Sequence, residues 1–91
     1  MRNYALPNGI ERGDSFVGTI VGTSRTGVYI RFTCQDIELD AFAPAGGVVG
    51  DEVMITALWY TKSRNSYRVG IDSYLSYSAD KKLARSILAA A

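Results

Sequence analysis

The stretch GTIVGTSRTGVYIRF, from Gly18 to Phe32, contains the pattern that decides the fold. Its second half alternates apolar residues from Val28 onward with Tyr29 and Arg31. Because successive side chains of a strand point to opposite faces, the apolar set can enter a core while Tyr29 and Arg31 share the outer surface. The first half carries two glycines inside an apolar strand, and such glycines commonly mark sharp bends. The stretch therefore favours a small, partly open barrel over a sandwich.

Four further apolar segments surround the first one and complete a five-strand pattern. All five are short and rich in β-branched and aromatic residues, and the breaks between them contain turn-forming residues. The segments are DSFVGTIVGT (14–23), GVYIRFT (27–33), IELDAFA (37–43), DEVMITALWY (51–60) and SYRVGIDSY (66–74). We therefore predict one all-β domain over residues 13–77.

The two ends of the chain do not follow the strand pattern. Residues 1–12 are polar and non-periodic, with Pro7 among them, and predict a lead-in segment. Ser78 is a suitable N-cap, and the apolar residues that follow it recur at helical spacing, which predicts a short C-terminal α-helix over 78–91. We expect this helix to pack on the barrel and to cover Trp59. The alternative is a helix that binds a partner or dimerises.

Composition excludes most classes of enzyme. The 91 residues suffice for one compact domain. The chain has no histidine, so the commonest general base and every Ser-His or Cys-His nucleophile are missing. Cys34 is the only cysteine, which leaves neither an internal disulfide nor a cysteine cluster for zinc. We expect no catalytic residues, metal, cofactor or small-molecule substrate.

Sequence features also indicate a cellular location. No apolar run reaches the roughly 18 to 20 residues that span a bilayer, and the first residues lack the apolar stretch of a signal peptide. We therefore predict a cytoplasmic protein without a membrane partner. The net charge of +1 does not by itself indicate a nucleic-acid binder, so the positions of the charges matter more.

Several local motifs together resemble the S1 family of RNA-binding domains, which are found in ribosomal and RNA-processing proteins. The resemblance covers residues 13–73. Its marks are Gly18 in the first strand, Gly27 and Tyr29 in the second, VGDEV (49–53) leading into the fourth, and Arg68 in the fifth. The VGDEV motif is the most specific of these. The resemblance implies a five-stranded OB-fold Greek-key barrel that binds single-stranded RNA on the face of its second, third and fifth strands.

The family's functional positions can be carried over one residue at a time. Its base-stacking aromatic of the second strand corresponds to Tyr29, and its basic residue of the fifth strand corresponds to Arg68. This chain has Thr26, Ala41 and Thr61 where the family has a second aromatic, a histidine and an acid. The resemblance therefore implies one stacking ring and one cation.

The residues themselves add further candidates for binding RNA. Single strands are bound by flat aromatic faces that stack on bases and by cations that follow the phosphates. Positive charges cluster between Tyr60 and Gly70 with no acid among them, and another lies in the loop before the second strand. The predicted RNA-binding residues are Tyr29, Arg31, Arg68, Lys62, Arg64, Phe42 and Arg25.

The third segment leaves two alternatives open. Glu38 and Asp40 are expected to point outward, where they either pair with Arg31 and Arg25 or accept hydrogen bonds from base edges. Phe42 either shares this outward parity and can stack a base, or is turned into the core by a bulge.

Together these observations predict a non-catalytic RNA-binding domain. We expect weak binding of single-stranded RNA with low sequence specificity, and single-stranded DNA offers the same kinds of faces and phosphates. Such a domain would act inside a larger RNA-processing, transcription or ribosomal complex. The alternative is a protein-protein interaction module on an OB-fold that has lost its nucleic-acid site.

Overall fold

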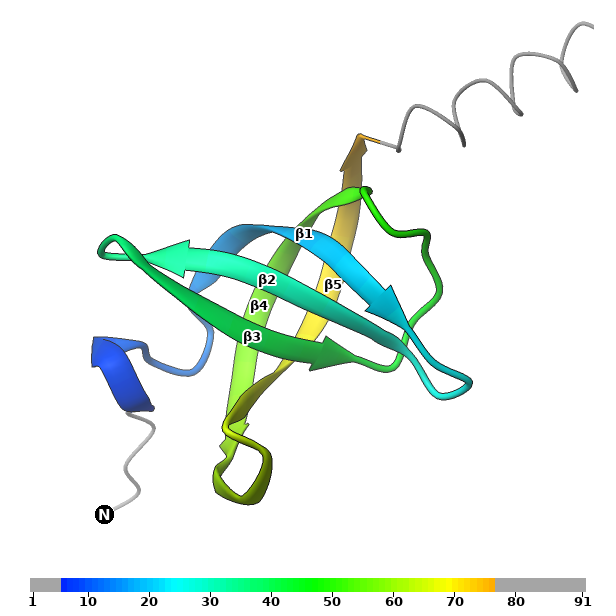
Figure 1. The fold of residues 1–91 in the computed structure, drawn as a ribbon. Coiled ribbons are helices and arrows are strands. Elements are labelled where there is room, and N and C mark those ends of the chain that lie inside the picture. Colours follow the sequence, from blue (N-terminus) through cyan, green and yellow to red (C-terminus); the bar gives the residue numbers. More distant parts are fainter. Residues whose placement is uncertain (1–5, 77–91) are drawn as a thin grey trace, which may run out of the picture.

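The computed structural model describes residues 6–76, which contain five strands (Figure 1). The strands are β1 Ser15–Thr23, β2 Val28–Cys34, β3 Ile37–Ala43, β4 Glu52–Thr61 and β5 Ser66–Ser76. All five predicted segments are therefore strands, and no boundary differs from the prediction by more than two residues. The predicted C-terminal helix over 78–91 lies outside the described residues.

The five strands close into a barrel in the order β1-β2-β3-β5-β4. β3 and β5 pair in parallel, and the other neighbours pair antiparallel. This arrangement is an all-β Greek-key barrel of the OB-fold type, which confirms the predicted fold class. The described helices are two single-turn 3₁₀ helices, η1 Pro7–Gly9 and η2 Lys62–Arg64, and none has the length and apolar character to cross a bilayer.

Alternating apolar side chains fill the interior of the barrel. On β2 the inward set is completely buried, with Val28 and Phe32 each 2% exposed and Ile30 fully enclosed. The other four strands contribute Ile20, Ala41, Ala43, Val53, Ile55, Ala57, Tyr67 and Val69. The alternation read from the sequence therefore assigns the core face of β2 correctly.

The two glycines of β1 lie where the strand bends around the barrel. A Cβ atom added to Gly18 would lie 2.5 Å from the Ile30 Cγ2 atom, so the glycine lets β1 and β2 approach closely. Farther along, the pairing with β2 skips Val21, which stands as an extra residue between Ile20 and Gly22. This β-bulge increases the local bend of the strand.

The VGDEV motif forms the turn into β4. Gly50 adopts a φ of 100°, a left-handed conformation that favours glycine. The buried carboxylate of Asp51 accepts a hydrogen bond from the Val48 N–H at 3.1 Å. The Ile20 N–H donates to the Asp51 carbonyl at 2.9 Å, and the Gly50 N–H donates to the Ile20 carbonyl at 2.8 Å. The motif thus anchors the β3–β4 loop on β1.

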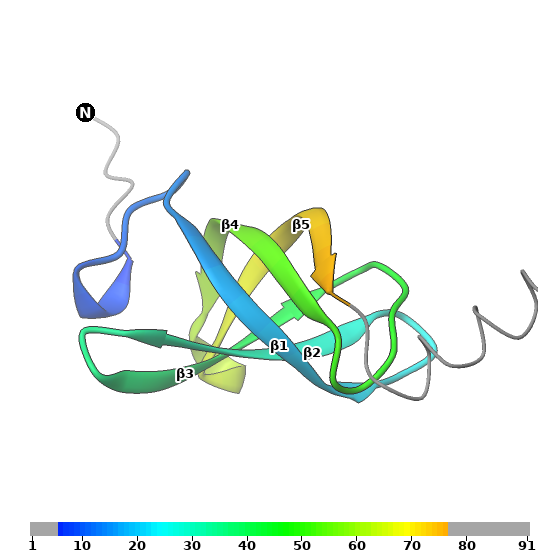
Figure 2. The same ribbon diagram turned by 90° about the horizontal axis from the view of Figure 1, so that it is seen from above.

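The segment before β1 covers the end of the barrel where the β2–β3 turn lies (Figures 1 and 2). Its Ile10 side chain is 1% exposed and belongs to the core. The Tyr67 hydroxyl donates a hydrogen bond to the Pro7 carbonyl at 2.7 Å and accepts one from the Asn8 Nδ2 atom at 2.9 Å. The described part of the predicted lead-in segment therefore packs on the barrel, and a domain boundary at residue 13 leaves out a core residue.

Candidate nucleic-acid interface

Four outward side chains on four strands lie next to one another across the barrel. Tyr29 of β2 pairs with Phe42 of β3, Phe42 pairs with Arg68 of β5, and Arg68 pairs with Trp59 of β4. Side chains at directly paired positions on one face of a sheet are neighbours. We call the set formed by Tyr29, Phe42, Arg68 and Trp59 the outer row.

Contacts along the outer row are continuous from ring to ring. The Tyr29 and Phe42 ring centroids are 5.4 Å apart at an interplanar angle of 59°. The Arg68 Cζ atom lies 5.4 Å from the Phe42 centroid and 5.3 Å from the Trp59 centroid. The guanidinium therefore makes cation–π contacts with two rings at once. Tyr29 is 46% exposed and Trp59 is 49% exposed, so both ends of the row reach solvent.

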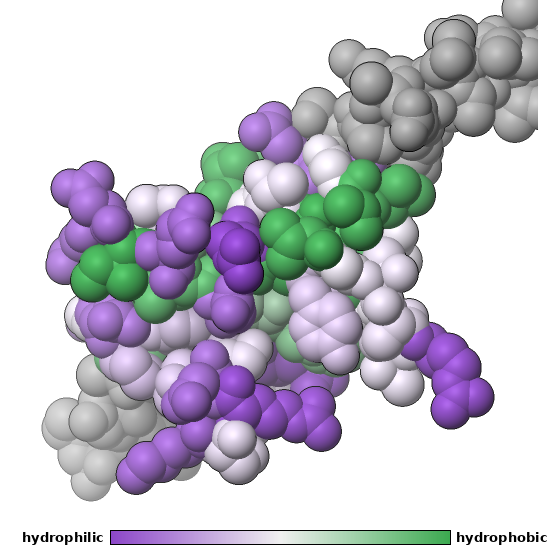
Figure 3. All heavy atoms as spheres, in the orientation of Figure 1, coloured by the Kyte–Doolittle hydropathy of each residue, from purple (hydrophilic) through white to green (hydrophobic). Residues whose placement is uncertain are grey.

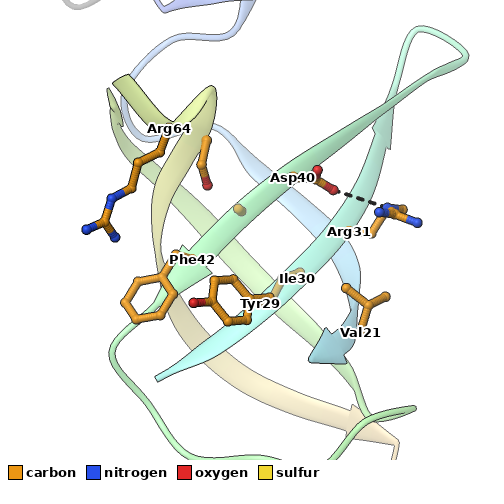
Figure 4. A pocket seen from close by; sticks show the side chains of 9 residues that line it. Val21, Tyr29, Ile30, Arg31, Asp40, Phe42 and Arg64 are labelled. Atoms are coloured by element: carbon orange, nitrogen blue, oxygen red, sulfur yellow. Dashed lines mark hydrogen bonds and ion pairs between the residues drawn. The ribbon is translucent and has the colours of Figure 1, made fainter. Parts of the chain in front are cut away.

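Two hollows adjoin the outer row. The larger, of about 630 Å³, is lined by Tyr29, Phe42, Arg31 and Asp40 among others, and Figure 4 shows these side chains on the neighbouring strands β2 and β3. The smaller, of about 290 Å³, includes Arg68 in its lining. Phe42 lines both hollows. On the face of the molecule seen in Figure 3, apolar side chains form a band with hydrophilic side chains beside it.

The alternation of β3 is regular, which resolves the orientation of Phe42. Ala41 and Ala43 are buried, so Phe42 between them points outward and the alternative of a core position is wrong. A Cβ atom on Gly27 would lie 2.6 Å from the Phe42 Cζ atom and 2.2 Å from the Ala43 carbonyl oxygen. Gly27 is therefore required for the Phe42 ring to lie beside Tyr29.

Arg31 forms the cross-strand pair that the sequence left open. Its Nε atom lies 3.1 Å from the Asp40 Oδ1 atom, and the two residues are direct partners in the β2–β3 ladder. Both side chains are well exposed, and exposed pairs of this kind contribute only about 0 to 1 kcal/mol. The pair therefore places one cation and one carboxylate in the larger hollow without burying either.

The remaining predicted cations lie on the two loops that flank this face. Arg64 of η2 lines both hollows. Lys62 of the same turn is exposed and lines neither of the two. Arg25 in the β1–β2 loop is also exposed and outside both linings, although its neighbour Thr26 lines the smaller hollow. Five of the seven predicted residues thus border the hollows, and two lie on the adjoining loops.

Trp59 was not among the predicted RNA-binding residues. In the β4–β5 ladder Ala57 pairs with Val69 and Trp59 with Arg68, so Leu58 is an extra, bulged residue. The bulge reverses the alternation and turns Trp59 outward against Arg68, where the residue is 49% exposed. The helix predicted to cover it lies outside the described residues. Tyr60 turns inward, with its ring 4.9 Å from that of Tyr67. The sequence did contain a signal for an exposed aromatic here, because Trp59 and Tyr60 are adjacent and two neighbouring strand residues cannot both point into the core.

The chain carries no recognisable metal cluster in the described part: within residues 6–76, no three His, Cys, Asp or Glu side chains are grouped to hold an ion. Comparison with known proteins gives no match to any family model, curated protein or solved structure at a significant level. The description of the site therefore depends on its own geometry, which is a row of three aromatic rings and one guanidinium across four strands of an OB-type barrel.

Proposed function

We propose that this domain is a non-catalytic, S1-like module that binds single-stranded RNA across the outer row. The observation that carries the proposal is the unbroken contact from Tyr29 through Phe42 and Arg68 to Trp59. Stacking surfaces combined with cations are what single-strand binding requires. OB-folds also bind oligonucleotides on the face of their second and third strands and with the two loops beside it. Tyr29 and Phe42 lie on the face of β2 and β3, and both hollows adjoin it.

Each part of the site has a distinct role in this proposal. Bases stack on the exposed ring of Tyr29 and the partly buried ring of Phe42, while Arg31, Arg64 and Arg68 interact with phosphates at the edges of the hollows. Stacking tolerates any base, because every base has a π face, so the sequence preference is low. The carboxylate of Asp40 repels phosphate and limits the affinity.

Weak, salt-sensitive binding suits a domain that works inside a larger assembly. Three phosphate contacts give a slope of about −2 in a plot of log affinity against log salt, at about 0.7 per contact for single strands. The proposed context is a cytoplasmic RNA-processing, transcription or ribosomal complex, in which other subunits add affinity. Single-stranded DNA presents the same bases and phosphates and serves as the comparison ligand.

Fluorescence anisotropy with short labelled RNA and DNA oligomers at two salt concentrations tests the proposal. Tyr29→Ala and Arg68→Ala should each weaken RNA binding by roughly 5- to 150-fold, the range of one lost stacking contact. Val17→Ala on β1 is the matched control, because it removes a 50% exposed apolar side chain that lines neither hollow. Circular dichroism verifies that each variant is folded.

Two results would contradict the proposal. If the folded domain binds no RNA at low salt, the RNA function is wrong and a protein-binding role takes its place. If RNA binds but both variants keep the affinity of the parent protein, the outer row is the wrong face.

A further inference from the structure

We infer that Trp59 is a second base-stacking site and that the ligand is a strand of several nucleotides, long enough to extend from Tyr29 to Trp59. This inference rests on the proposed function, because it extends the binding face from β2, β3 and β5 onto β4. It adds a residue that the sequence pattern did not select.

The first support is the state of the Trp59 side chain. The residue is 49% exposed, although tryptophan usually buries most of its large surface. The ring contacts the Arg68 guanidinium, 5.3 Å from its centroid, and so is held in place. A large aromatic side chain that is oriented by a neighbour yet half open to solvent has the properties of a stacking platform.

The second support is the placement of one β-bulge on β1 and one on β4, each next to a position of the outer row or its ladder partner. Val21 is the extra residue of β1, and Gly22 beside it pairs with Tyr29. Leu58 is the extra residue of β4, immediately before Trp59. Bulges are common beside functional sites, where they redirect a side chain. The β4 bulge allows Tyr60 to point into the core. The core would be packed in the same way whatever residue occupied position 59, because that side chain points outward. Packing of the core therefore does not explain why position 59 is a tryptophan.

The distances along the row determine the size of the ligand. Phe42 and Arg68 lie between Tyr29 and Trp59, and each of the three successive contacts exceeds 5 Å. Successive nucleotides of one strand are about 3.4 Å apart along a stacked helix. A strand that follows the surface from Tyr29 past Phe42 and Arg68 to Trp59 therefore has other nucleotides between the two that stack at the ends.

The experiment uses the fact that Trp59 is the only tryptophan in the chain. Its fluorescence therefore reports on this end of the row alone. The full chain is titrated with a uridine dinucleotide and a uridine octanucleotide at low salt, and the affinity is measured in parallel by anisotropy. The octanucleotide should quench the tryptophan emission and bind more tightly than the dinucleotide.

Three variants at position 59 separate stacking from support of Arg68. Trp59→Ala should reduce the affinity for the octanucleotide by roughly 5- to 150-fold. It should also diminish the gain, meaning the increase in affinity from the dinucleotide to the octanucleotide. Trp59→Phe keeps a ring and should retain most of that gain. Trp59→Leu keeps an apolar contact for Arg68 without a π face and should lose the gain. Val17→Ala again controls for the loss of exposed apolar surface.

The outcomes distinguish this inference from the proposed function. If the octanucleotide binds with no change in tryptophan emission, and Trp59→Ala keeps the parent affinity, the second stacking site does not exist while RNA binding stands. If Trp59→Leu binds as tightly as Trp59→Phe, the residue only supports Arg68 and the inference is wrong. If neither oligonucleotide binds, both the inference and the proposed function fail.

Discussion

Two groups of aromatic side chains in this barrel have similar distances between their rings, but one group lies inside the barrel and the other on its outer surface. The inner cluster consists of Phe16, Phe32, Tyr60 and Tyr67, with ring centroids 4.9 to 5.6 Å apart. The outer row has a comparable ring separation of 5.4 Å between Tyr29 and Phe42. Ring contacts alone therefore do not distinguish a core from a binding site.

The difference lies in what surrounds the rings. Within the inner cluster, Tyr67 is 2% exposed and its hydroxyl bonds to Pro7 and Asn8, so ring and polar group are both satisfied inside the fold. Along the outer row, the neighbour of Phe42 and Trp59 is a guanidinium, and the end rings face solvent. The inner cluster should therefore govern stability and the outer row should govern binding.

The largest expected effect comes from removing one phenylalanine from each group. Phe32→Ala should lower the free energy of unfolding by about 3 to 5 kcal/mol, because it leaves a cavity in the core. Phe42→Ala should cost at most about 1.5 kcal/mol, the value of a lost aromatic pair at a partly exposed site. Urea denaturation measures both. If Phe32→Ala does not fold, Phe32→Leu serves in its place and should still cost more than Phe42→Leu; equal losses would abolish the distinction between the groups.

An intermediate effect is expected from the titration of the inner cluster. Burial raises the pKa of Tyr67 above its ordinary value of 10.0, and the neighbouring Tyr60 and Cys34 add to the rise, while the hydrogen bond from Asn8 opposes it. A raised pKa in the folded state means that the protonated hydroxyl stabilises the fold fully below pH 10.0 and that this contribution is lost as the pH rises through the folded-state pKa.

Urea denaturation across this alkaline range provides the measurement. The free energy of unfolding should fall more steeply with pH above 10.0 in the parent protein than in Tyr67→Phe, which cannot ionise at this position. Identical pH dependence in the two proteins would show that the Tyr67 hydroxyl does not titrate with folding.

The smallest expected effect concerns the charge beside the outer row. Asp40→Asn removes a carboxylate from the larger hollow and frees Arg31 from its ion pair. RNA affinity should rise by less than about fivefold, as expected for an exposed charge interaction of up to about 1 kcal/mol, and stability should change by a similarly small amount. A drop in RNA affinity would mean that Asp40 accepts hydrogen bonds from the RNA bases instead of repelling its phosphates.

The sequence predicted the parts of this molecule in which alternation is unbroken. β2 and β3 pair residue by residue from Val28 to Cys34, so the inward set and the outward position of Tyr29 followed directly from the pattern. The orientation of Phe42 stayed open, because a seven-residue segment is too short for its pattern to show whether it contains a bulge. Trp59 was missed because a bulge does reverse the alternation of β4. Ile10 was missed because a single apolar residue in a polar segment has no periodicity to reveal its burial.

The sequence showed which segment carries the positive charges, but not which of these side chains line the hollows. Lys62 and Arg64 are two residues apart in one turn, yet only Arg64 lines the hollows. The direction of a side chain in a turn depends on backbone angles, such as the left-handed φ of 48° at Asn65, that no local pattern specifies. The cluster of basic residues was therefore predictable from the sequence, and the orientation of each basic side chain was not.

The extra residue at Leu58 means that the β4 end of this surface is set by backbone register as well as by side-chain chemistry. Leu58 has no partner in β5, so its deletion would leave Ala57 opposite Val69 and Trp59 opposite Arg68, with Trp59 still outward and Tyr60 still inward. A change of register that paired Leu58 with Arg68 would instead turn Trp59 inward and Tyr60 outward. Related sequences are therefore best compared by the position of the extra residue in this strand before comparing residue identities.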